Sequence, residues 1–571
     1  MIRSLFGVEC EWAITGWDGR EPASREELVH QFFQAACRKL PHVRDVGSSS
    51  GIFLANGARF YIDCGMHPEM TTPECTTPWE VVRYIRAGER IMEDLAQEVQ
   101  SRSPARMEVL CFRCNVDYGG TGSTWGCHTS FLHRAAPSGL PDQMIPHLIS
   151  RVVYTGAGGF NPRVTWPEFC VAPRLLHIER VVSGDSTGNR GIFHTKNETL
   201  STDGYNRLHI LCGENLCSET AMVLMMGATA LVVAMAEAGL RPCASLQLSA
   251  PLDSLHTVAK DPTCRARLRL AKGGEITAIE IQRRLLELAE RNLAALPPWA
   301  GELCALWRGT LNRLEESPDS MASTLDWAIK QRLFAAHAGR RGIPFHRFPL
   351  FNGMVAGLNG ALANLPLAAR SVRLAALSGP ASPIPEESAR CAATLAFNGL
   401  TWTDLDNFLA LRDELFQLDT RFGQAGPRGI FGALERQGVL DHHVPGVDRI
   451  EEAVAAPPAE GRAHIRGEVI RRLSGQSGAA AGWQGVYTGD GRVLDLNDPF
   501  AAAEVWTESK REPEPEQELP LPPFPPDLPI DELFGRDPNR IQQALDAMRR
   551  RYGRIRTRSQ SPAETPQGPG R

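Results

Sequence analysis

The sequence predicts an α+β fold, because two kinds of periodicity occur in one chain of 571 residues. Alternating aromatic and β-branched residues, as in FYID at 60–63, indicate strands near the N-terminus. Apolar residues at helical spacing, as in 78–101 and 276–296, indicate helices. A chain of this length can also bury a large core. We therefore expect a sheet packed against helices.

The segments follow in order along the chain. Strands are expected at 1–17 and 51–63, with a helix in EELVHQFFQAACRKL between them. Two strands are expected around the Gly-rich turn of 107–134, and short strands and loops over 141–215. Helices should fill most of the following ranges: 218–240, 276–296, 299–338 and 401–440. Residues 339–400 are rich in Pro, Ala and Gly and predict irregular structure, with an exposed loop at SGPASPIPEESA.

One uncharged apolar run, residues 221–236, could suggest a membrane span. It has about sixteen residues, fewer than the ~20 that cross a bilayer. Ser218 followed by Glu219 is typical of a helix start. We expect a buried helix behind the sheet and no membrane partner.

Composition and short motifs exclude several classes of protein. The net charge of −5 leaves no electrostatic footprint for nucleic acid. GGTGSTWG at 119–126 lacks the lysine of a P-loop, so it predicts a tight turn. The chain opens without a secretory signal and has 14 scattered cysteines, which favours a reduced, cytoplasmic setting. Cys111 and Cys114 lack a matching pair, so no zinc site is expected there.

The segment NGARFYIDCGMHPEMTTPEC at 56–75 is the strongest functional signal. On a strand, Arg59, Tyr61 and Asp63 share one face, which places a cation, an oxygen ligand and a carboxylate in one row. The Gly-Met-His-Pro turn that follows lets Glu69 come back toward that row. Such a set would be expensive to bury without a ligand.

A second carboxylate pair, Glu9 and Glu11 in GVECEW, also shares a strand face. Taken in isolation, a Glu-x-Glu pair is more often part of a solvated strand face than a ligand site. Asp63 or Glu69 alone could likewise be a turn or cap residue. Together, oxygen-rich carboxylate sites suit Mg²⁺ held with nucleotide phosphates.

These motifs resemble the family of Pup ligases and the related Pup deamidases/depupylases, which are relatives of glutamine synthetase and the carboxylate-amine ligases. The resemblance covers roughly residues 1–505. Besides the two segments above, it rests on RAGERIMEDL, CNVDYGGTGSTWGCH, RLHILCGENLCSET, LDWAIKQRLF, RGIFGALERQGVL, EEAVAAPP, IRGEVI and NDPF.

The resemblance implies a glutamine synthetase-like fold, in which a curved antiparallel sheet backed by helices cradles ATP and Mg²⁺. It also implies the chemistry of pupylation, which marks proteins for proteasomal degradation. ATP would phosphorylate the side chain of the C-terminal Glu of a small, disordered Pup-like modifier. A lysine amine of a target protein would then attack the acyl phosphate and form an isopeptide bond.

By match to the family, the metal ligands would be Glu9, Tyr61 and Glu69, and Arg59 and Thr72 would contact ATP. Asp63 would accept the proton of the attacking lysine, because an ammonium group cannot attack. Trp483 matches a tryptophan that contacts the nucleotide.

Further candidates are less specific. Glu11, His128 and His209 are additional metal candidates, although single histidines are more often satisfied core residues. The following arginines could neutralise phosphates or the developing acyl phosphate: Arg174, Arg190 and Arg207. Arg207 could instead pair with a surface carboxylate, and Trp483 could be a core anchor.

The sequence departs from the family at three places. The usual His-Glu-Asn is His128-Thr129-Ser130, which predicts the loss of a carboxylate and an amide from the site region. Thr-Arg-Asp-Glu-Pro-His is replaced by the residues 195–200, so a lysine stands for an arginine and cannot form its bidentate fork. Lys-Asn-Asn is replaced by residues 113–115. One wall of the active site is therefore expected to be altered.

Four interpretations stay open. The depupylase branch has a long insertion before the NGAR strand, whereas only about forty residues (17–55) lie there in this chain, which favours a ligase. A deamidase or depupylase, a weakened adaptor paralogue and a small-molecule glutamate–amine ligase are the alternatives.

Domain boundaries follow from the same patterns. A catalytic domain is expected over 1–440 and a small C-terminal domain over 441–510. Residues 511–571 form a Pro- and Glu-rich linker with a short basic amphipathic helix, largely disordered, that either docks a partner or is only solvated.

Overall fold

The computed structural model describes residues 3–103, 107–202, 204–361 and 385–508. All of these described residues belong to one compact unit. The predicted linker and basic helix of 511–571 therefore lie outside the described residues. The division at residue 440 stays a prediction.

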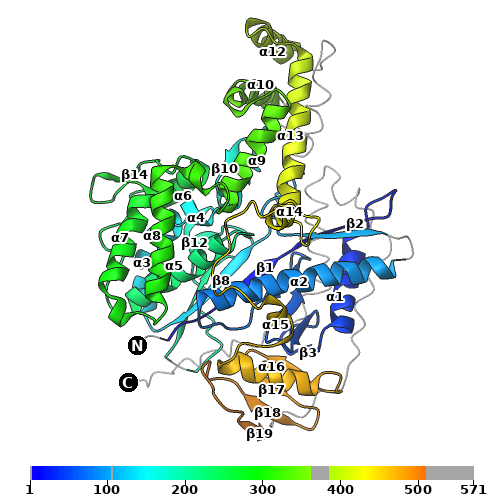
Figure 1. Cartoon of the computed structure of the whole chain (residues 1–571), viewed down its shortest axis with the longest axis vertical. Helices are drawn as coiled ribbons and strands as arrows, with labels where there is room; N and C mark the ends of the chain where they lie inside the picture. The colour runs from blue at the N-terminus through cyan, green and yellow to red at the C-terminus, as the bar shows by residue number, and fades with distance from the viewer. Residues whose placement is uncertain (1–2, 104–106, 203, 362–384, 509–571) are drawn as a thin grey trace, which may run out of the picture. The chain divides into compact units, whose positions relative to one another are not determined.

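An eleven-stranded sheet organises the described part of the chain, with the strand order β13-β8-β1-β6-β5-β4-β3-β16-β17-β18-β19 (Figure 1). Neighbouring strands are antiparallel except for β3 and β16, which are parallel. The strands are β1 Leu5–Glu11, β3 His42–Asp45, β4 Gly51–Leu54, β5 Arg59–Ile62, β6 Pro68–Thr71, β8 Cys127–His133, β13 Asn206–Ile210, β16 Ala480–Gly482, β17 Gly485–Tyr487, β18 Arg492–Asp495 and β19 Trp506–Glu508.

Four smaller sheets of two strands each accompany it. They pair β2 (Ala13–Trp17) with β7 (Glu108–Phe112), β9 (Gly159–Phe160) with β10 (Phe169–Cys170), β11 (Arg180–Ser183) with β12 (Gly191–His194), and β14 (Leu268–Arg269) with β15 (Glu275–Ile276). The predicted two strands of 107–134 thus exist, but β7 and β8 belong to different sheets.

Helices pack against one face of the main sheet. Phe6, Val8 and Cys10 of β1 alternate with the residues of the opposite face and enter the large apolar core with α2 (Pro78–Arg102) and α5 (Glu219–Glu237). The remaining helices of the described part are α1 Arg25–Lys39, α3 Leu140–Ser150, α4 Val152–Thr155, α6 Pro251–Lys260, α7 Ala278–Arg291, α8 Ala300–Glu316, α9 Asp326–Arg340, α10 Phe348–Ala361, α12 Pro385–Phe397, α13 Trp402–Phe422, α14 Ile430–Arg436, α15 Ile450–Ala455 and α16 Gly461–Leu473. The α+β prediction is confirmed.

Helix α5 confirms the prediction for the apolar run. Of the described helices it is the one long and apolar enough to cross a membrane, yet 94% of its most apolar stretch is buried inside the protein. Ser218 caps it, because its hydroxyl accepts the N–H of Ala221 at 3.2 Å. The helix is thus a core element.

Two stretches fold differently from the prediction. Residues 140–155 form α3 and α4, and α10 and α12 lie in the stretch predicted to be irregular. Pro385 begins α12, a position where proline is favoured because its missing N–H has no intrahelical partner. The predicted loop at 378–389 is therefore wrong from residue 385 onward, and its earlier part lies outside the described residues.

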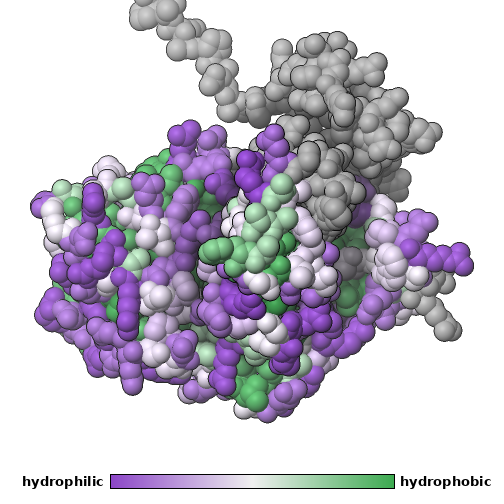
Figure 2. Space-filling model, turned by 90° about the horizontal axis from the view of Figure 1, so that it is seen from above, coloured by the Kyte–Doolittle hydropathy of each residue, from purple (hydrophilic) through white to green (hydrophobic). Residues whose placement is uncertain are grey.

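Helices α9, α10, α12 and α13 form an arm that projects from the body (Figure 1). The arm has its own apolar core, in which Phe351 stacks on Phe408 with ring centroids 4.7 Å apart. Seen from this end, hydrophilic side chains cover most of the surface and apolar colour is confined to separate patches (Figure 2).

Candidate active site

The polar face of the main sheet carries the predicted metal and phosphate residues. Facing residues of neighbouring antiparallel strands lie on the same side of a sheet. Glu9 of β1 faces His128 of β8 and Thr71 of β6, and Glu11 faces Glu69. Glu69 in turn faces Tyr61 of β5. His209 of β13 faces Ser130 of β8, so five strands bring together residues that are up to 200 positions apart.

Glu9 lies in a polar group with Arg207, His128 and His209. Arg207 donates to its carboxylate at 2.9 Å, and His128 Nδ1 lies 3.6 Å from it. Burial acts against ionisation, but the hydrogen bond with His128 and the guanidinium of Arg207 hold the pKa of Glu9 well below its ordinary value. Ligand atoms of Glu9, His128 and His209 all lie within 4.8 Å of one another.

His209 is neutral at physiological pH, because burial lowers its pKa to about 3. Its Nδ1 accepts a hydrogen bond from Arg207 at 2.9 Å and lies 3.2 Å from the Ser130 hydroxyl. A neutral imidazole can serve as a metal ligand. The structure thus brings Glu9, from the first set of metal candidates, together with His128 and His209 from the additional set, and their role as ligands stays a prediction.

Asp63 lies in the turn that joins β5 to β6, beside His67 and Glu11. The N–H of His67 donates to Asp63 Oδ1 at 2.6 Å, and His67 Nδ1 lies 3.5 Å from Asp63 Oδ2 and 3.3 Å from Glu11 Oε2. Burial opposes protonation, yet these two carboxylates raise the pKa of His67 to about 9. Burial likewise opposes ionisation of Glu11, but His67, His128 and Arg174 lower its pKa to about 2.

Glu69 provides the test of whether these residues fit a divalent cation. It is 4% exposed, and its Oε1 has no hydrogen-bond partner. Burial and the carboxylates of Glu9 and Glu11 raise its pKa well above the ordinary value. A cation would satisfy the orphaned oxygen and offset the repulsion among the three carboxylates. The donor set, with the Tyr61 hydroxyl beside Glu69, therefore fits Mg²⁺.

One buried arginine, Arg174, and one half-buried arginine, Arg190, leave positive charge near Glu11. Arg174 is 2% exposed and donates to the carbonyls of Leu211 at 2.7 Å and Gly213 at 2.8 Å, without an ion pair among the described residues. Arg190 donates to the Thr124 hydroxyl at 2.8 Å. Burial and the neighbouring Arg174 lower the pKa of Arg190 to about 10. Uncompensated cations of this kind favour an anionic ligand.

Glu9 also lines an open cavity, whose volume is about 650 Å³ when the solvent at its mouth is included. Thr72, Arg207, Arg462 and Trp483 line it, together with the start of β1 and residues 198–200. Trp483 also contacts Phe53 edge-on at 5.1 Å and lies under Arg466, so its ring is held in place. Thr72 accepts the N–H of Val8 at 3.1 Å.

Arg59 has a position different from the other candidates. It lies on the polar face, but its guanidinium pairs with Asp45 at 2.5 Å and lies 3.9 Å from the centre of the Tyr61 ring. Arg59 is not among the described residues that line the cavity. Its contact with ATP stays a prediction.

Thr129, where the family has a glutamate, does not lie on the polar face that carries the site. Thr129 pairs with Val8 and Ile210 on the apolar side and is fully buried, whereas Ser130 lies on the polar side. Ser130 accepts hydrogen bonds from Arg207 at 3.0 and 2.8 Å. Strand alternation from His128 predicts Ser130 on the site face, although the sequence motif by itself indicated only the loss of an amide there.

The other two departures lie in different surroundings. Lys196 is 46% exposed and pairs with Glu198 at 3.1 Å, while Leu200 lines the cavity. Arg113 is buried away from the polar face, where it pairs with Glu89 at 2.6 Å and donates to the carbonyl of Leu216. Arg113 is therefore structural, and the altered wall is confined to residues 198–200 and 130.

Glu74 connects the cavity wall to the C-terminal part. It accepts hydrogen bonds from Arg462 at 2.7 Å and from Arg466. Burial opposes its ionisation, but the two guanidinium groups lower its pKa to about 2. The Glu74 ion pairs therefore stabilise the fold above the ordinary pKa near 4.5, and this contribution is lost as the pH falls toward 2.

We expect Glu74→Gln to lower the free energy of unfolding by about 3 kcal/mol at pH 7, because it leaves two buried cations unpaired. Urea unfolding of both proteins at pH 7 and pH 3 measures this, and the difference should shrink at pH 3. The exposed Glu302→Gln is the matched control and should change nothing. Equal stability of Glu74→Gln and wild type at pH 7 would contradict the assignment.

Comparisons with known proteins agree on one family. The sequence model of the family described as Pup-ligase protein matches residues 4–349 and 397–487, more than half of the chain. The Pup–protein ligase of Geodermatophilus obscurus is 28% identical over 521 residues, which cover 88% of this chain and 98% of that relative.

Two solved structures have a similar fold. The complex between the prokaryotic ubiquitin-like protein Pup and its ligase PafA superposes with a TM-score of 0.67 at 25% identity, covering 88% of this chain and 90% of the other. The Pup ligase PafA in complex with ADP superposes with a TM-score of 0.60 at 24% identity, covering 84% and 91%.

Proposed function

This chain belongs to the Pup-ligase protein family and is an ATP-dependent ligase, and from that premise we propose that it joins the C-terminal Glu side chain of a Pup-like modifier to lysine amines of other proteins. The observation that carries the proposal is the polar face of the main sheet. Three carboxylates and two uncompensated arginines meet there beside a cavity. Such a site can hold both phosphates and a carboxylate.

The reaction has two steps. The γ-phosphate of ATP is transferred to the modifier's Glu carboxylate, which gives a glutamyl phosphate and ADP. A lysine amine then attacks the acyl carbon, phosphate leaves, and an isopeptide bond forms. Phosphoryl transfer depends on positioning and charge neutralisation more than on covalent help from the protein. Arg174, Arg190 and Arg207 supply this positive charge, with Arg174 held by two carbonyls before any ligand arrives.

The residues that would hold Mg²⁺ are Glu9, Tyr61 and Glu69, with Glu11, His128 and His209 beside them. When bound, Mg²⁺ neutralises phosphate charge. The unpartnered Oε1 of Glu69 supports this assignment.

Asp63 takes the proton of the attacking lysine in this proposal. Its carboxylate is held by the N–H of His67 and faces the His67 ring, so its position is defined by its own turn. A base within hydrogen-bond reach of the amine is necessary because the protonated amine has no lone pair.

In this proposal the nucleotide base binds in the cavity against Trp483, with Thr72 nearby and Arg59 further along the same face. The modifier and the target protein then approach from the open polar face. The proposal includes a cytoplasmic setting, which the 14 free cysteines support.

We expect Trp483→Ala to raise KM for ATP by roughly 5- to 10-fold with little change in kcat, because one aromatic contact with the base is worth about 1 kcal/mol. Steady-state kinetics at varied ATP measure it. Trp506→Ala is the matched control, because Trp506 packs on the same apolar core but does not line the cavity. An equal rise of KM in both variants would assign the effect to general destabilisation.

The proposal is tested by incubating the protein, ATP and Mg²⁺ with a Pup-like peptide ending in Glu, and separately with one ending in Gln. Mass spectrometry reads both reactions. A modifier–lysine conjugate that requires ATP supports the ligase. Conversion of Gln to Glu without conjugation would instead support the deamidase, and nucleotide binding without turnover in either reaction would support the adaptor.

A further inference from the structure

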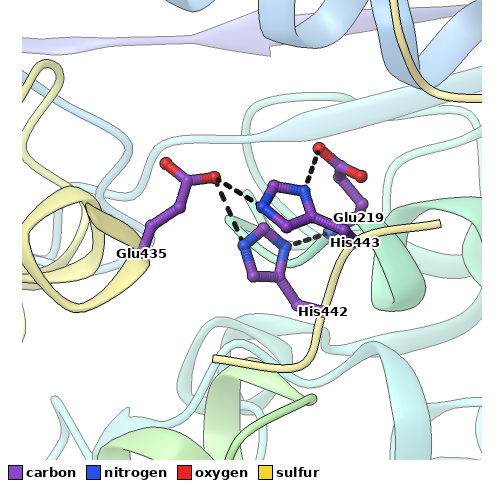
Figure 3. A group of neighbouring side chains, drawn as sticks. All are labelled: Glu219, Glu435, His442 and His443. Atoms are coloured by element: carbon purple, nitrogen blue, oxygen red, sulfur yellow. Dashed lines mark hydrogen bonds and ion pairs between the residues drawn. The ribbon is translucent and has the colours of Figure 1, made fainter. Parts of the chain in front are cut away.

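Two histidines and two glutamates gather at a place that shares no residue with the candidate active site (Figure 3). Glu219 begins α5, Glu435 lies in α14, and His442 and His443 follow α14 in the chain. The four side chains point toward one another, and one ligand atom from each lies within 4.8 Å of all the others. Three separate segments therefore converge on one point.

The spacing of these atoms suits a four-coordinate metal. His443 Nδ1 lies 3.2 Å from Glu219 Oε1, His442 Nε2 lies 3.3 Å from Glu435 Oε1, and His443 Nε2 lies 3.8 Å from the same oxygen. Ligands about 2 Å from a tetrahedral zinc ion are separated by roughly 3.3 Å. One imidazole gives a single nitrogen to an ion, so the separations to compare are those of 3.2 Å and 3.3 Å, and both match that value.

His442 supplies an independent indication. Its ring is fully buried, and its Nε2 points at Glu435 Oε1 at 3.3 Å but makes no well-aligned hydrogen bond with it. A buried ring nitrogen without an aligned hydrogen bond is costly, and a metal ion would satisfy it better. Ligation through Nε2 places the ring proton on Nδ1, so the 3.3 Å contact that Nδ1 accepts from the N–H of Glu219 is lost.

The surrounding charges hold the carboxylates in place. Arg86 of α2 donates to Glu435 at 2.8 Å, pairs with Glu89 at 3.2 Å and lies 4.0 Å from Glu219 Oε1, so its charge is shared among three carboxylates. The N–H of Val444 donates to the second oxygen of Glu219 at 3.0 Å, which leaves Oε1 directed at His443. Such outer contacts are typical of the groups that orient metal ligands.

We infer that Glu219, Glu435, His442 and His443 bind a structural transition-metal ion, for which zinc is the best match. Two imidazoles and two carboxylates suit Zn²⁺, whereas Mg²⁺ and Ca²⁺ prefer oxygen ligands alone. The ion joins α5 and α14 to the segment after residue 440, where the sequence predicts the start of the C-terminal domain. Its role is to hold that segment on the catalytic part.

The test is a Zn²⁺ titration of the full chain, freed of metal and then saturated with Mg²⁺ and ADP so that the catalytic group is occupied. One equivalent of Zn²⁺ should bind, and X-ray absorption should show four N/O ligands. His443→Ala is the informative variant, because His443 is 63% exposed and its removal leaves the core intact. It should weaken Zn²⁺ binding on the order of 100-fold.

Two controls separate this site from others. His346→Ala removes an exposed histidine of the arm and should not change Zn²⁺ affinity. Glu9→Gln combined with His128→Ala removes the catalytic group and should leave this Zn²⁺ bound. Absence of a Zn²⁺ equivalent in the wild type, or undiminished binding by folded His443→Ala, would overturn the inference.

Discussion

Replacing Asp63 with Asn is expected to slow lysine ligation by roughly 10²- to 10⁴-fold while ATP binding is retained, because the variant keeps the shape of the turn but cannot accept a proton. Single-turnover conjugation with a Pup-like peptide measures the rate, and calorimetry measures ATP binding. Asp490→Asn, an exposed change at a distant turn, is the matched control.

A second nucleophile makes this prediction specific. Hydroxylamine is uncharged at neutral pH and needs no base, so it should trap the activated modifier as a hydroxamate equally well in Asp63→Asn and in wild type. If the variant loses hydroxamate formation together with ligation, Asp63 acts in the phosphoryl transfer or in folding instead, and its assignment as the proton acceptor is wrong.

Replacing Glu69 with Gln is expected to reduce ATP turnover by roughly 10³-fold, because it removes a carboxylate from the set that would hold the divalent cation, a contribution of several kcal/mol. The same change should not destabilise the protein in the absence of metal. Glu69 is buried among Glu9 and Glu11, and a neutral amide relieves their repulsion.

These two effects are measured together, as ATP hydrolysis with the modifier peptide and as the thermal midpoint in EDTA. Glu80→Gln is a suitable control, since Glu80 is also partly buried but lies at the start of α2. A marked fall of the midpoint in EDTA with normal ATP turnover would show that Glu69 is a structural residue rather than a metal ligand.

Local sequence patterns are sufficient to predict the strands that form the site. Strand alternation places Glu9 and Glu11 together, and the length of the uncharged run 221–236, with Ser218 before it, predicts a buried helix. The same local reasoning failed at α10 and α12, because a Pro- and Ala-rich composition was interpreted as irregular although Pro385 begins a helix.

Tertiary structure decided which strands are neighbours. The parallel pairing of β16 with β3 extends the sheet and supports the wall that carries Trp483. The pairing of β8 with β1 directs Ser130 to the site and Thr129 to the core. Both depend on contacts between distant segments, which no short-range periodicity specifies.

By itself, the sequence determined the fold class, the family and the residues of the polar strand face, because these depend on periods of two and 3.6 residues and on ordered motifs. Only the tertiary structure decided that Arg174 lacks an ion pair among the described residues and that Glu219, Glu435, His442 and His443 meet. Charge balance and ligand geometry arise from the packing of segments that are distant in the sequence, more than 200 residues in the case of Glu219 and Glu435, so they exist only in the folded chain.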